Sequence, residues 1–293
     1  MQALIEKANI LIEALPYIKK FYGKTFVIKY GGAAQVDSAL KDAFAQDIVL
    51  LNFIGIHPVV VHGGGPKISE MMKKLGKEPS FVHGQRVTDA ETMDIVEMVL
   101  GGLINKEIVS LINSHGGGAV GISGKDGSLI RAEKKVVKRR SPETGEDEII
   151  DLGLVGKVKE VDTSVLANLE EKNFIPVVSP IGMGPKGESL NINADYVAAA
   201  LAGALKAEKL ILLTDVPGIL DKKGKVTSTI SAKKALKMID EGAVSGGMIP
   251  KVQACLGALK AGVGKTHILD GRLPHCLLLE IFTKEGVGTE ITP

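Results

Sequence analysis

Hydrophobic and polar residues follow two different periods along this chain. Apolar residues recur at every third or fourth position over 1–22, which predicts an amphipathic helix that is bent or interrupted near Pro16. From Thr25 onward, short apolar runs that end in glycine alternate with stretches of helical period. This βαβ rhythm predicts an α/β fold, a three-layer sandwich in which helices cover both faces of a mainly parallel sheet.

The same pattern predicts the individual elements. The expected strands cover 25–30, 58–61, 119–122, 175–179 and 209–214, and we expect six or more strands in total. The expected helices after the first cover 37–54, 66–75, 90–114, 163–172 and 194–206. No linker or repeat interrupts the rhythm, so a boundary between two lobes is expected inside it, near Pro180.

The segment 128–158 carries an unusual charge pattern. A basic run is followed, after Ser141 and Pro142, by an acidic one; the charged residues are Lys134, Lys135, Lys138, Arg139, Arg140, Glu143, Glu146, Asp147 and Glu148. An anion site and a solvated hairpin with opposite charges on its two arms both fit this pattern. We interpret it as a polar hairpin and assign it no chemistry.

Composition excludes several classes of protein. The 36 basic residues nearly balance the 34 acidic ones, so no broad positive field is present to attract nucleic acid or an anionic membrane. Cys255 and Cys276 lie in no disulfide framework or zinc-ligand spacing, as expected for a reducing cytoplasm. Charged residues interrupt 1–22, and no later stretch is long and apolar enough to cross a membrane. We expect a cytoplasmic protein whose partners are small molecules or copies of itself.

Two glycine patterns resemble nucleotide-binding motifs without matching them. Gly264-Lys265-Thr266 resembles the end of a P-loop, but the position that requires glycine holds Leu259. Gly182, Gly184 and Gly187 follow a strand, yet Pro185 and the polar stretch after it prevent a helix from opening there. Neither is expected to bind a nucleotide in those ways.

Two other glycine clusters stand where a parallel sheet places its ligands. Lys29-Tyr30-Gly31-Gly32 ends the first expected strand, and His62-Gly63-Gly64-Gly65-Pro66 ends the second. Glycine allows a close approach of the backbone, and a helix that begins at such a loop presents free N–H groups to an oxyanion. Tight turns alone would explain one such cluster, but two at successive strand ends favour an anion site.

Three more polar clusters follow later in the chain. They are Asn191-Ile192-Asn193-Ala194-Asp195, the segment from Leu213 to Leu220, and Ser245-Gly246-Gly247-Met248-Ile249-Pro250-Lys251. In the first, Asn193 or Asp195 could simply cap the following helix. The other two are turn sequences that contain charged residues.

Together these clusters resemble the motifs of the amino acid kinase family. The segments are KYGG, VVHGGGP, GQRVTD, NINAD, LLTDVPGIL and GGMIPK, in family order and spacing, and the resemblance runs from Lys29 to Thr289. Their details are most similar to the members that phosphorylate the side-chain carboxylate of N-acetyl-L-glutamate, in arginine biosynthesis. The resemblance implies an N-lobe at 23–180 that binds acetylglutamate and dimerises, and a C-lobe at 181–293 that binds ATP.

The resemblance also implies roles for particular residues. Lys29 and Lys251 would flank the transferring phosphoryl group, and Asp195 would hold both lysines. The substrate would contact Gly64, Gly65, Arg86, Asn191 and Asn193. The nucleotide would contact Gly31, Gly32, Asp215, Val216, Pro217, Gly218, Ile219, Leu220, Ala243, Val244 and Ser245. The sequence offers no carboxylate cluster for a metal, so Mg²⁺ is expected to be held mainly by the nucleotide phosphates.

The residue types suit that reaction on chemical grounds. A substrate carboxylate is already ionised at neutral pH, so its attack on the γ-phosphorus needs no general base. The reaction needs charge neutralisation between two anions, which lysines, Mg²⁺ and aligned N–H groups supply. Arg86 suits a planar carboxylate because a guanidinium can donate two parallel hydrogen bonds, although a surface arginine is the alternative.

The helix at 1–22 is an addition to the α/β rhythm. Its apolar stripe could pack on its own chain or be exchanged between subunits. Arginine-inhibited kinases that resemble this chain use such a helix to join dimers into a hexamer. There, L-arginine would bind at the positions that match Tyr17, Lys209, His267, Glu280 and Gly286. We expect a hexamer, a trimer of dimers, with arginine as an allosteric inhibitor.

Other members of the family and one other class remain as alternatives. A different carboxylate or carbamate kinase would share the glycine loops, but carbamate and uridylate kinases match GQRVTD and NINAD less well. The domains added to aspartokinases and glutamate 5-kinases are not expected here. A non-catalytic arginine-sensing protein would keep the fold, but the presence of Lys29, Asp195 and Lys251 speaks against it.

Overall fold

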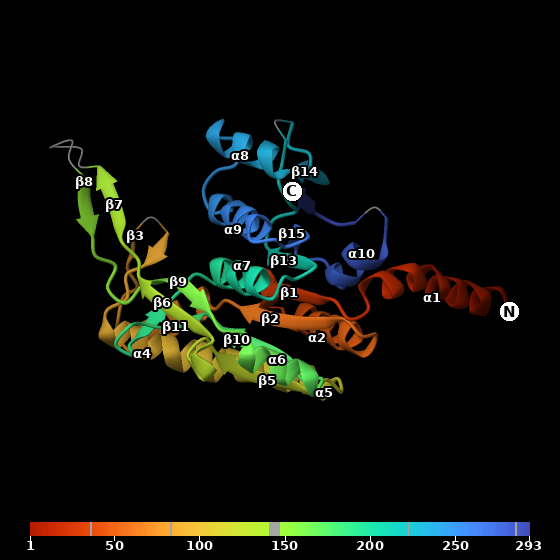
Figure 1. Cartoon of the computed structure of the whole chain (residues 1–293), viewed down its shortest axis with the longest axis horizontal. Helices are drawn as coiled ribbons and strands as arrows, with labels where there is room; N and C mark the ends of the chain where they lie inside the picture. The colour runs from red at the N-terminus through yellow and green to blue at the C-terminus, as the bar shows by residue number, and fades with distance from the viewer. Residues whose placement is uncertain (36, 83, 141–146, 222, 285) are drawn as a thin grey trace.

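An eight-stranded sheet forms the centre of the molecule (Figure 1). The structure is a computed structural model that describes residues 1–35, 37–82, 84–140, 147–221, 223–284 and 286–293. The strands lie in the order β14-β16-β15-β13-β1-β2-β10-β5, and every neighbouring pair is parallel except β15 and β16. Their bounds are β1 (Thr25–Tyr30), β2 (His57–His62), β5 (Ala119–Ser123), β10 (Ile175–Ser179), β13 (Lys209–Thr214), β14 (Thr229–Ser231), β15 (Lys265–Asp270) and β16 (Thr289–Thr292).

Helices cover both faces of this sheet, which confirms the expected three-layer α/β sandwich. Side chains that alternate along the strands divide into two buried cores: Phe26 and Ile28 of β1 face one, and Val27 faces the other. The first core is completed mainly by α2 (Ser38–Phe53), α3 (Gly65–Lys74), α4 (Ala90–Glu97), α5 (Asn105–Ser114) and α10 (Cys276–Phe282). The second is completed mainly by α6 (Ser164–Glu171), α7 (Ala194–Ala204), α8 (Ala232–Asp240) and α9 (Met248–Lys260).

The helix at the N-terminus, α1 (Gln2–Phe21), is continuous through Pro16, so of the expected bend or interruption the interruption is wrong. Proline removes only one backbone hydrogen bond, and on an exposed helix water can satisfy the carbonyl that is released. The end of α1 is anchored, because Phe21 is buried against Phe26 and Tyr17 packs edge-on against Phe282 of α10. Figure 1 shows the beginning of α1 extending away from the rest of the chain.

The expected single helix at 90–114 is also corrected. A π-helical segment, η2 (Met98–Ile104), separates α4 from α5. A π-helix pairs residues five apart, so it accommodates additional backbone that a plain 3.6-residue period does not reveal. The segment contains the glycine pair Gly101 and Gly102, which have low helix propensity.

Over its described residues, the segment 128–158 has the two antiparallel arms of the expected hairpin, which pair in two successive ladders. Its base belongs to a four-stranded sheet in the order β12-β11-β6-β9, made of β6 (Ile130–Lys134), β9 (Gly156–Val161), β11 (Ile181–Met183) and β12 (Ser189–Asn191). Its tip is the pair β7 (Val137–Arg140) and β8 (Asp147–Ile150). The expected positions Glu143 and Glu146 lie outside the described residues. A further short pair is β3 (Phe81–Val82) with β4 (Gln85–Arg86).

The two misleading glycine patterns have ordinary structural roles. Lys265 begins strand β15, so Gly264-Lys265-Thr266 leads into a strand and not into a helix. Gly182 lies in β11, and the chain turns at Gly187 into β12 as a hairpin. Neither pattern forms a helix N-terminus.

Candidate active site

A cavity of about 1080 Å³ opens beyond the carboxyl ends of β1 and β2. Its walls come from the glycine-rich ends of those strands, the β4 and β9 ribbons, the π-helix, and the first turns of α3, α7 and α9. The carboxyl end of a parallel sheet is where such folds place their ligands, because helix N-termini and loop amides converge there. Residues from widely separated parts of the chain therefore meet in one space.

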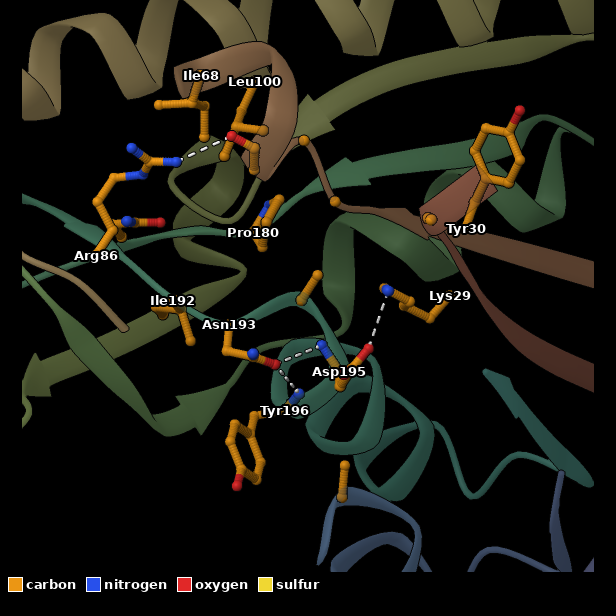
Figure 2. Close-up of a pocket in the computed structure, with 18 of the residues that line it drawn as sticks. Lys29, Tyr30, Ile68, Arg86, Leu100, Pro180, Ile192, Asn193, Asp195 and Tyr196 are labelled. Carbon is orange, nitrogen blue, oxygen red and sulfur yellow. Dashed lines mark hydrogen bonds and ion pairs between the residues drawn. The ribbon is translucent and has the colours of Figure 1, made fainter. Parts of the chain in front are cut away.

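A carboxylate flanked by two ammonium groups lies at the floor of this cavity. Lys29 Nζ is 3.1 Å from Asp195 Oδ1, and Lys251 Nζ is 2.9 Å from Asp195 Oδ2. Figure 2 shows Lys29 and Asp195 pointing toward each other from β1 and α7. One carboxylate cannot balance two cations, so the cluster carries excess positive charge where it faces the cavity.

Burial and mutual attraction shift the pKa values of this cluster. Burial lowers the pKa of Lys29, and Asp195 opposes that shift. Burial would raise the pKa of Asp195, but the charges of Lys29 and Lys251 outweigh it and hold the pKa below its ordinary value. Asp195 is therefore an ionised anchor for the lysines and is not suited to be a general base at neutral pH.

The glycines after β1 are required by close contacts. A Cβ at position 31 would lie 2.6 Å from Lys29 Nζ, so any side chain there would displace the ammonium group. Gly32 has a φ of 70°, which glycine adopts without strain, and it begins the short turn η1 (Gly32–Gln35). The Tyr30 hydroxyl donates to the Ala34 carbonyl at 2.6 Å and closes that turn.

The glycines after β2 lead directly into α3. Gly64 is the N-cap, Gly65 is the first helical residue, and Pro66 follows where its missing N–H costs nothing. The first N–H groups of a helix have no partner inside it, so the amides of this turn are free to bind an oxyanion. A Cβ at Gly64 would lie within 2.6 Å of both Leu100 and Ile104, so the π-helix packs directly against this loop.

Arg86 is buried in the cavity wall, not on the surface. Its Nη2 donates to the Gly65 carbonyl at 2.9 Å and to Ser69 Oγ at 2.8 Å, and its guanidinium lies over the Phe81 ring. Burial lowers the pKa of Arg86. Among the residues that the structure describes, no carboxylate lies within ion-pair distance of it. A buried guanidinium without a counter-ion is suited to bind a carboxylate.

The two asparagines of the NINAD segment play different parts. Asn193 Oδ1 accepts hydrogen bonds from the N–H groups of Asp195 and Tyr196, at 2.9 Å and 3.4 Å (Figure 2). It therefore caps α7 and fixes the backbone that carries Asp195. Asn191 donates to Thr88 Oγ1 at 3.3 Å and lines the cavity.

Comparisons with known proteins agree with this geometry. A profile of the family described as "Amino acid kinase family" matches residues 24–270. The chain belongs to the amino acid kinase family. It is 59% identical to the acetylglutamate kinase of Sulfurihydrogenibium sp. (strain YO3AOP1), over 100% of both chains. It is 60% identical to that of Syntrophobacter fumaroxidans, over 98% of this chain and 97% of the other. The expectation of a kinase enzyme is therefore confirmed.

Solved structures place this amino acid kinase in the same fold. N-acetylglutamate synthase from Neisseria gonorrhoeae, complexed with coenzyme A and N-acetyl-glutamate, aligns with a TM-score of 0.82 at 26% identity. That alignment covers 98% of this chain but only 63% of the synthase chain. A Giardia carbamate kinase aligns with a TM-score of 0.65 over 92% of this chain; at 18% identity, it shows the fold alone.

The segments expected at the nucleotide lie outside the cavity lining in this kinase, apart from Gly31 and Gly32. Asp215 follows β13, and its N–H would lie 3.5 Å from a Cβ at Gly32. Ile219 and Val244 are buried in the second core, and the Ile219 N–H donates to Thr289 Oγ1 at 2.8 Å. Ile219 and Val244 thus belong to the same core, while Asp215 lies beside Gly32 at the carboxyl end of β13.

A second buried charge cluster lies at the opposite end of β13 in this kinase. Lys209 Nζ is 2.8 Å from His267 Nε2, and His267 Nδ1 is 2.8 Å from Glu280 Oε1. Burial lowers the pKa of Lys209 to about 8. Glu280 also accepts from the Val287 N–H at 2.7 Å and lies beside Gly286, whose φ is 62°. Four of the five expected arginine-site residues therefore meet, and Tyr17 approaches the same helix α10 through Phe282.

The sequence pattern missed part of the cavity wall. Leu100 and Ile104 of the π-helix contact the glycine loop, and the only signal for them was the glycine pair in the middle of an expected helix. Lys135 also lines the cavity, with its Nζ 5.6 Å from the centre of the Tyr196 ring, although its segment had been assigned no chemistry.

Metal-ligand clusters and membrane-spanning helices are absent from the described part of this kinase. No group of three or more His, Cys, Asp or Glu side chains in those ranges could hold a metal ion. No helix found there combines the length and the apolar character that crossing a bilayer requires.

Proposed function

We propose that this protein is an acetylglutamate kinase, which transfers the γ-phosphoryl group of ATP to the side-chain carboxylate of N-acetyl-L-glutamate in arginine biosynthesis. The observation that carries the proposal is the Lys29–Asp195–Lys251 cluster, which opens on a cavity whose wall also holds Arg86, a guanidinium with no described carboxylate at ion-pair distance. Full-length identity of about 59% to acetylglutamate kinases supports N-acetyl-L-glutamate as the substrate within the family. The products would be N-acetyl-L-glutamyl 5-phosphate and ADP.

The substrate would bind in the N-lobe, at 23–180. Arg86 would hold the α-carboxylate, and the free amides of Gly64 and Gly65 would donate to the side-chain carboxylate that attacks phosphorus. Asn191 would donate to the substrate from the opposite wall. Asn193 lines the cavity too, but its side-chain oxygen already caps α7, which supports an indirect role.

The chemistry would consist of positioning and charge neutralisation. The attacking carboxylate needs no base, and the buried position of ionised Asp195 between two lysines supports an anchoring role. Lys29 and Lys251 would stabilise the charge that develops on the transferring phosphoryl group and on the leaving ADP. This cluster lines the same cavity as Gly64, Gly65 and Arg86.

The nucleotide would bind against the C-lobe, at 181–293. Gly31 and Gly32 would approach its phosphates, while 215–220 and 243–245 would contact the rest of the nucleotide. The carboxylate at the cavity floor is already paired with two lysines, so it is poorly suited to coordinate a metal. Mg²⁺ would therefore enter with ATP, held mainly by the phosphates, and would supply further neutralisation of their charge.

We further propose that L-arginine inhibits the enzyme by binding where Tyr17, Lys209, His267, Glu280 and Gly286 meet. A guanidinium or an α-amino group of arginine would pair with Glu280, which is ionised: burial opposes its ionisation, but the His267 hydrogen bond lowers its pKa. Arginine would favour an arrangement of the lobes that is less competent for transfer.

The exposed side of α1 supports a hexameric assembly. Leu4, Leu11 and Ile12 lie on one face of this helix and are each more than 60% exposed. Such an apolar stripe is stabilised when it packs against another copy of α1, and exchange of this helix would join dimers into a ring. The same helix carries Tyr17, so assembly and arginine binding would be coupled.

An assay that couples ADP release to a spectroscopic signal tests the catalytic proposal. N-acetylglutamate, glutamate, aspartate and carbamate are compared as acceptors at equal concentration with Mg²⁺–ATP. We expect N-acetylglutamate to be the best acceptor. Faster turnover of carbamate would indicate a carbamate kinase, and no ADP release with any acceptor would favour a non-catalytic arginine-binding protein.

A further inference from the structure

His62, the last residue of β2, is buried directly beneath the glycine loop. Its side chain is fully enclosed, with Nδ1 3.0 Å from the Gly63 carbonyl and Nε2 3.2 Å from the Asn105 amide nitrogen. Phosphoryl transfer as proposed above assigns no part to this ring. Its two contacts nevertheless connect the glycine loop to the residue that begins α5.

The orientation of the Asn105 amide is fixed by its other neighbours. Its Nδ2 lies 2.9 Å from the Val177 carbonyl and 3.4 Å from the Ile122 carbonyl, and its Oδ1 lies 3.1 Å from Lys106 Nζ. A carbonyl can only accept and an ammonium can only donate, so the NH₂ group of Asn105 faces the two carbonyls and His62, which share its two hydrogens. His62 Nε2 is therefore an acceptor.

This orientation fixes the tautomer of His62. Because Nε2 accepts from Asn105, the proton of the neutral ring lies on Nδ1, where it donates to the Gly63 carbonyl. Burial, supported by the charge of Lys106, lowers the pKa of His62 to about 4. The ring is therefore neutral at physiological pH, and the donor to Gly63 is permanent.

A fixed Gly63 carbonyl also fixes the next N–H group. The carbonyl accepts a second bond from Gln35 Nε2 at 3.3 Å, so it is held from two directions. The peptide between Gly63 and Gly64 is planar and trans, so the Gly64 N–H points opposite to that carbonyl. Glycine has no side chain to restrict its backbone torsions. The two hydrogen bonds to the Gly63 carbonyl therefore supply the restriction that this residue lacks.

The π-helix supports the same peptide from the other side. Leu100 and Ile104 occupy the space that a Cβ of Gly64 would take, and Asn105 follows directly after them. Strand β5 makes room for Asn105, because a Cβ at Gly121 would lie only 1.8 Å from its Oδ1. The π-helix thus provides the side chains that pack against Gly64, and the residue after it, Asn105, provides the amide that orients His62.

We propose that His62 is a positioning residue, held by Asn105 in its neutral Nδ1–H form, which aims the Gly64 N–H at the carboxylate of the acceptor substrate. This inference rests on the proposed substrate role of Gly64. His62 does not touch the substrate and exchanges no proton with it. His62 affects how tightly the acceptor substrate binds and how it is aligned. A misaligned Gly64 N–H would make a weaker hydrogen bond to the reacting carboxylate.

NMR of the imidazole nitrogens of the whole protein tests the tautomer without any substrate. We expect His62 Nδ1 to be of the protonated type and Nε2 of the unprotonated type, and both to remain so as the pH falls from 8 to about 5. Asn105→Asp replaces both amide donors with acceptors and should bring a proton to Nε2. A wild-type Nε2–H tautomer, or a protonated ring near neutral pH, would overturn the proposal.

Kinetics of two His62 variants test the positioning role. His62→Leu removes the donor and should raise the acetylglutamate KM at least about tenfold, equivalent to about 1.4 kcal/mol, with an ATP KM within about twofold. His62→Asn keeps an N–H near the position of Nδ1 and should recover most of that loss. His57→Asn, at the half-buried start of the same strand and outside the lining of the large cavity, is the matched control and should match wild type.

The outcomes separate the two proposals. A wild-type enzyme that does not use acetylglutamate would overturn the proposed function, whereas the NMR result would still decide the tautomer. Equal rises in both KM values, or no recovery in His62→Asn, would show that His62 only supports folding and would overturn positioning. If His62→Leu does not fold, His62→Asn and His62→Gln are compared with wild type. The Gln side chain reaches toward Asn105 but not toward Gly63. His62→Gln should therefore lose affinity for the acceptor, whereas His62→Asn should keep it.

Discussion

Two buried lysines lie at opposite ends of neighbouring strands, and the side chains around them differ. Lys29 lies near the carboxyl end of β1 in register with Leu212, while Lys209 begins β13 in register with Phe26. Lys29 and Lys251 share a single carboxylate and face a cavity. Lys209 contacts His267, which contacts Glu280, and its Nζ lies 5.5 Å from the centre of the Phe21 ring.

The two clusters differ in whether their charges are balanced and in whether a ligand can reach them. The first cluster leaves positive charge uncompensated next to open space, so an anionic ligand can bind without breaking an existing ion pair. The second cluster places its own carboxylate, Glu280, beside His267 and lies outside the lining of the large cavity. A ligand there must replace internal contacts and shift neighbouring elements, which suits regulation better than turnover.

Loss of either cavity lysine should have the largest effect. Lys29→Ala or Lys251→Ala should lower kcat by about 10² to 10³ and change both KM values far less, because the lost interaction is strongest in the transition state. Lys209→Ala, the matched change in the second cluster, should leave kcat within about twofold in the absence of arginine. Steady-state kinetics of the three variants measure this contrast. A similar loss in all three would show that a buried lysine matters for folding alone.

Removal of the anchoring charge should have the next largest effect. Asp195→Asn should lower kcat about 10- to 100-fold, since two ammonium groups would face each other without a carboxylate between them. Asp195 raises the pKa of Lys29, so its loss should lower that pKa further.

The pH dependence gives the sign of this effect. Wild-type kcat should be at its full value at neutral pH. It should fall as rising pH removes the proton of Lys29, with a midpoint below the ordinary lysine pKa of 10.5. In Asp195→Asn, this alkaline limb should move to lower pH. A pH–kcat profile of both enzymes tests the claim, and an acidic limb lost only in the variant would instead identify Asp195 as a base.

A change in the second cluster should alter inhibition by arginine and leave kcat without arginine nearly unchanged. Glu280→Ala should raise the inhibitory arginine concentration at least about tenfold while kcat without arginine stays within about twofold. Inhibition curves at fixed substrate concentrations measure this shift. Glu171→Ala, which removes an exposed carboxylate at the end of α6, is the control. Unchanged inhibition in Glu280→Ala would place the arginine site elsewhere.

The smallest effect on turnover is expected from the start of α1. Deleting residues 1–13 removes most of the exposed apolar stripe and retains Tyr17 and buried Phe21. Light scattering should show dimers in place of hexamers, arginine inhibition should weaken, and kcat should stay within about twofold. A shortened protein that keeps the full mass and the full response to arginine would contradict the coupling of assembly to inhibition.

Much of the fold and part of the candidate site could be predicted from the sequence. The strands at 25–30, 175–179 and 209–214 have the expected bounds, because a doubly covered parallel strand requires a continuous apolar run and polar or glycine residues at its end. Asp37 and Asn193 cap their helices as short polar side chains do. The resemblance assigned roles to Lys29, Asp195 and Lys251, and the structure brings them together.

Other features could not be predicted from local pattern. The π-helix follows a period that a short stretch of apolar residues does not reveal, so one long helix was expected at 90–114. The tautomer of His62 depends on Asn105, and that amide in turn depends on a carbonyl of β10 and on Lys106. The burial of Arg86 depends on the packing of its β3–β4 hairpin, which includes Phe81, against Ser69 of α3.

The sequence by itself determined where strands end, where helices begin and which ends carry charge, because these depend on backbone torsions and hydrogen bonds within a few residues. Only the tertiary structure decided that Lys29 shares Asp195 with Lys251 while Lys209 is enclosed with His267 and Glu280. Those pairings follow from strand order and register, which are set by the packing of two cores across the whole chain. Burial then gives each pairing its electrostatic strength, since the same charges in water would interact far more weakly.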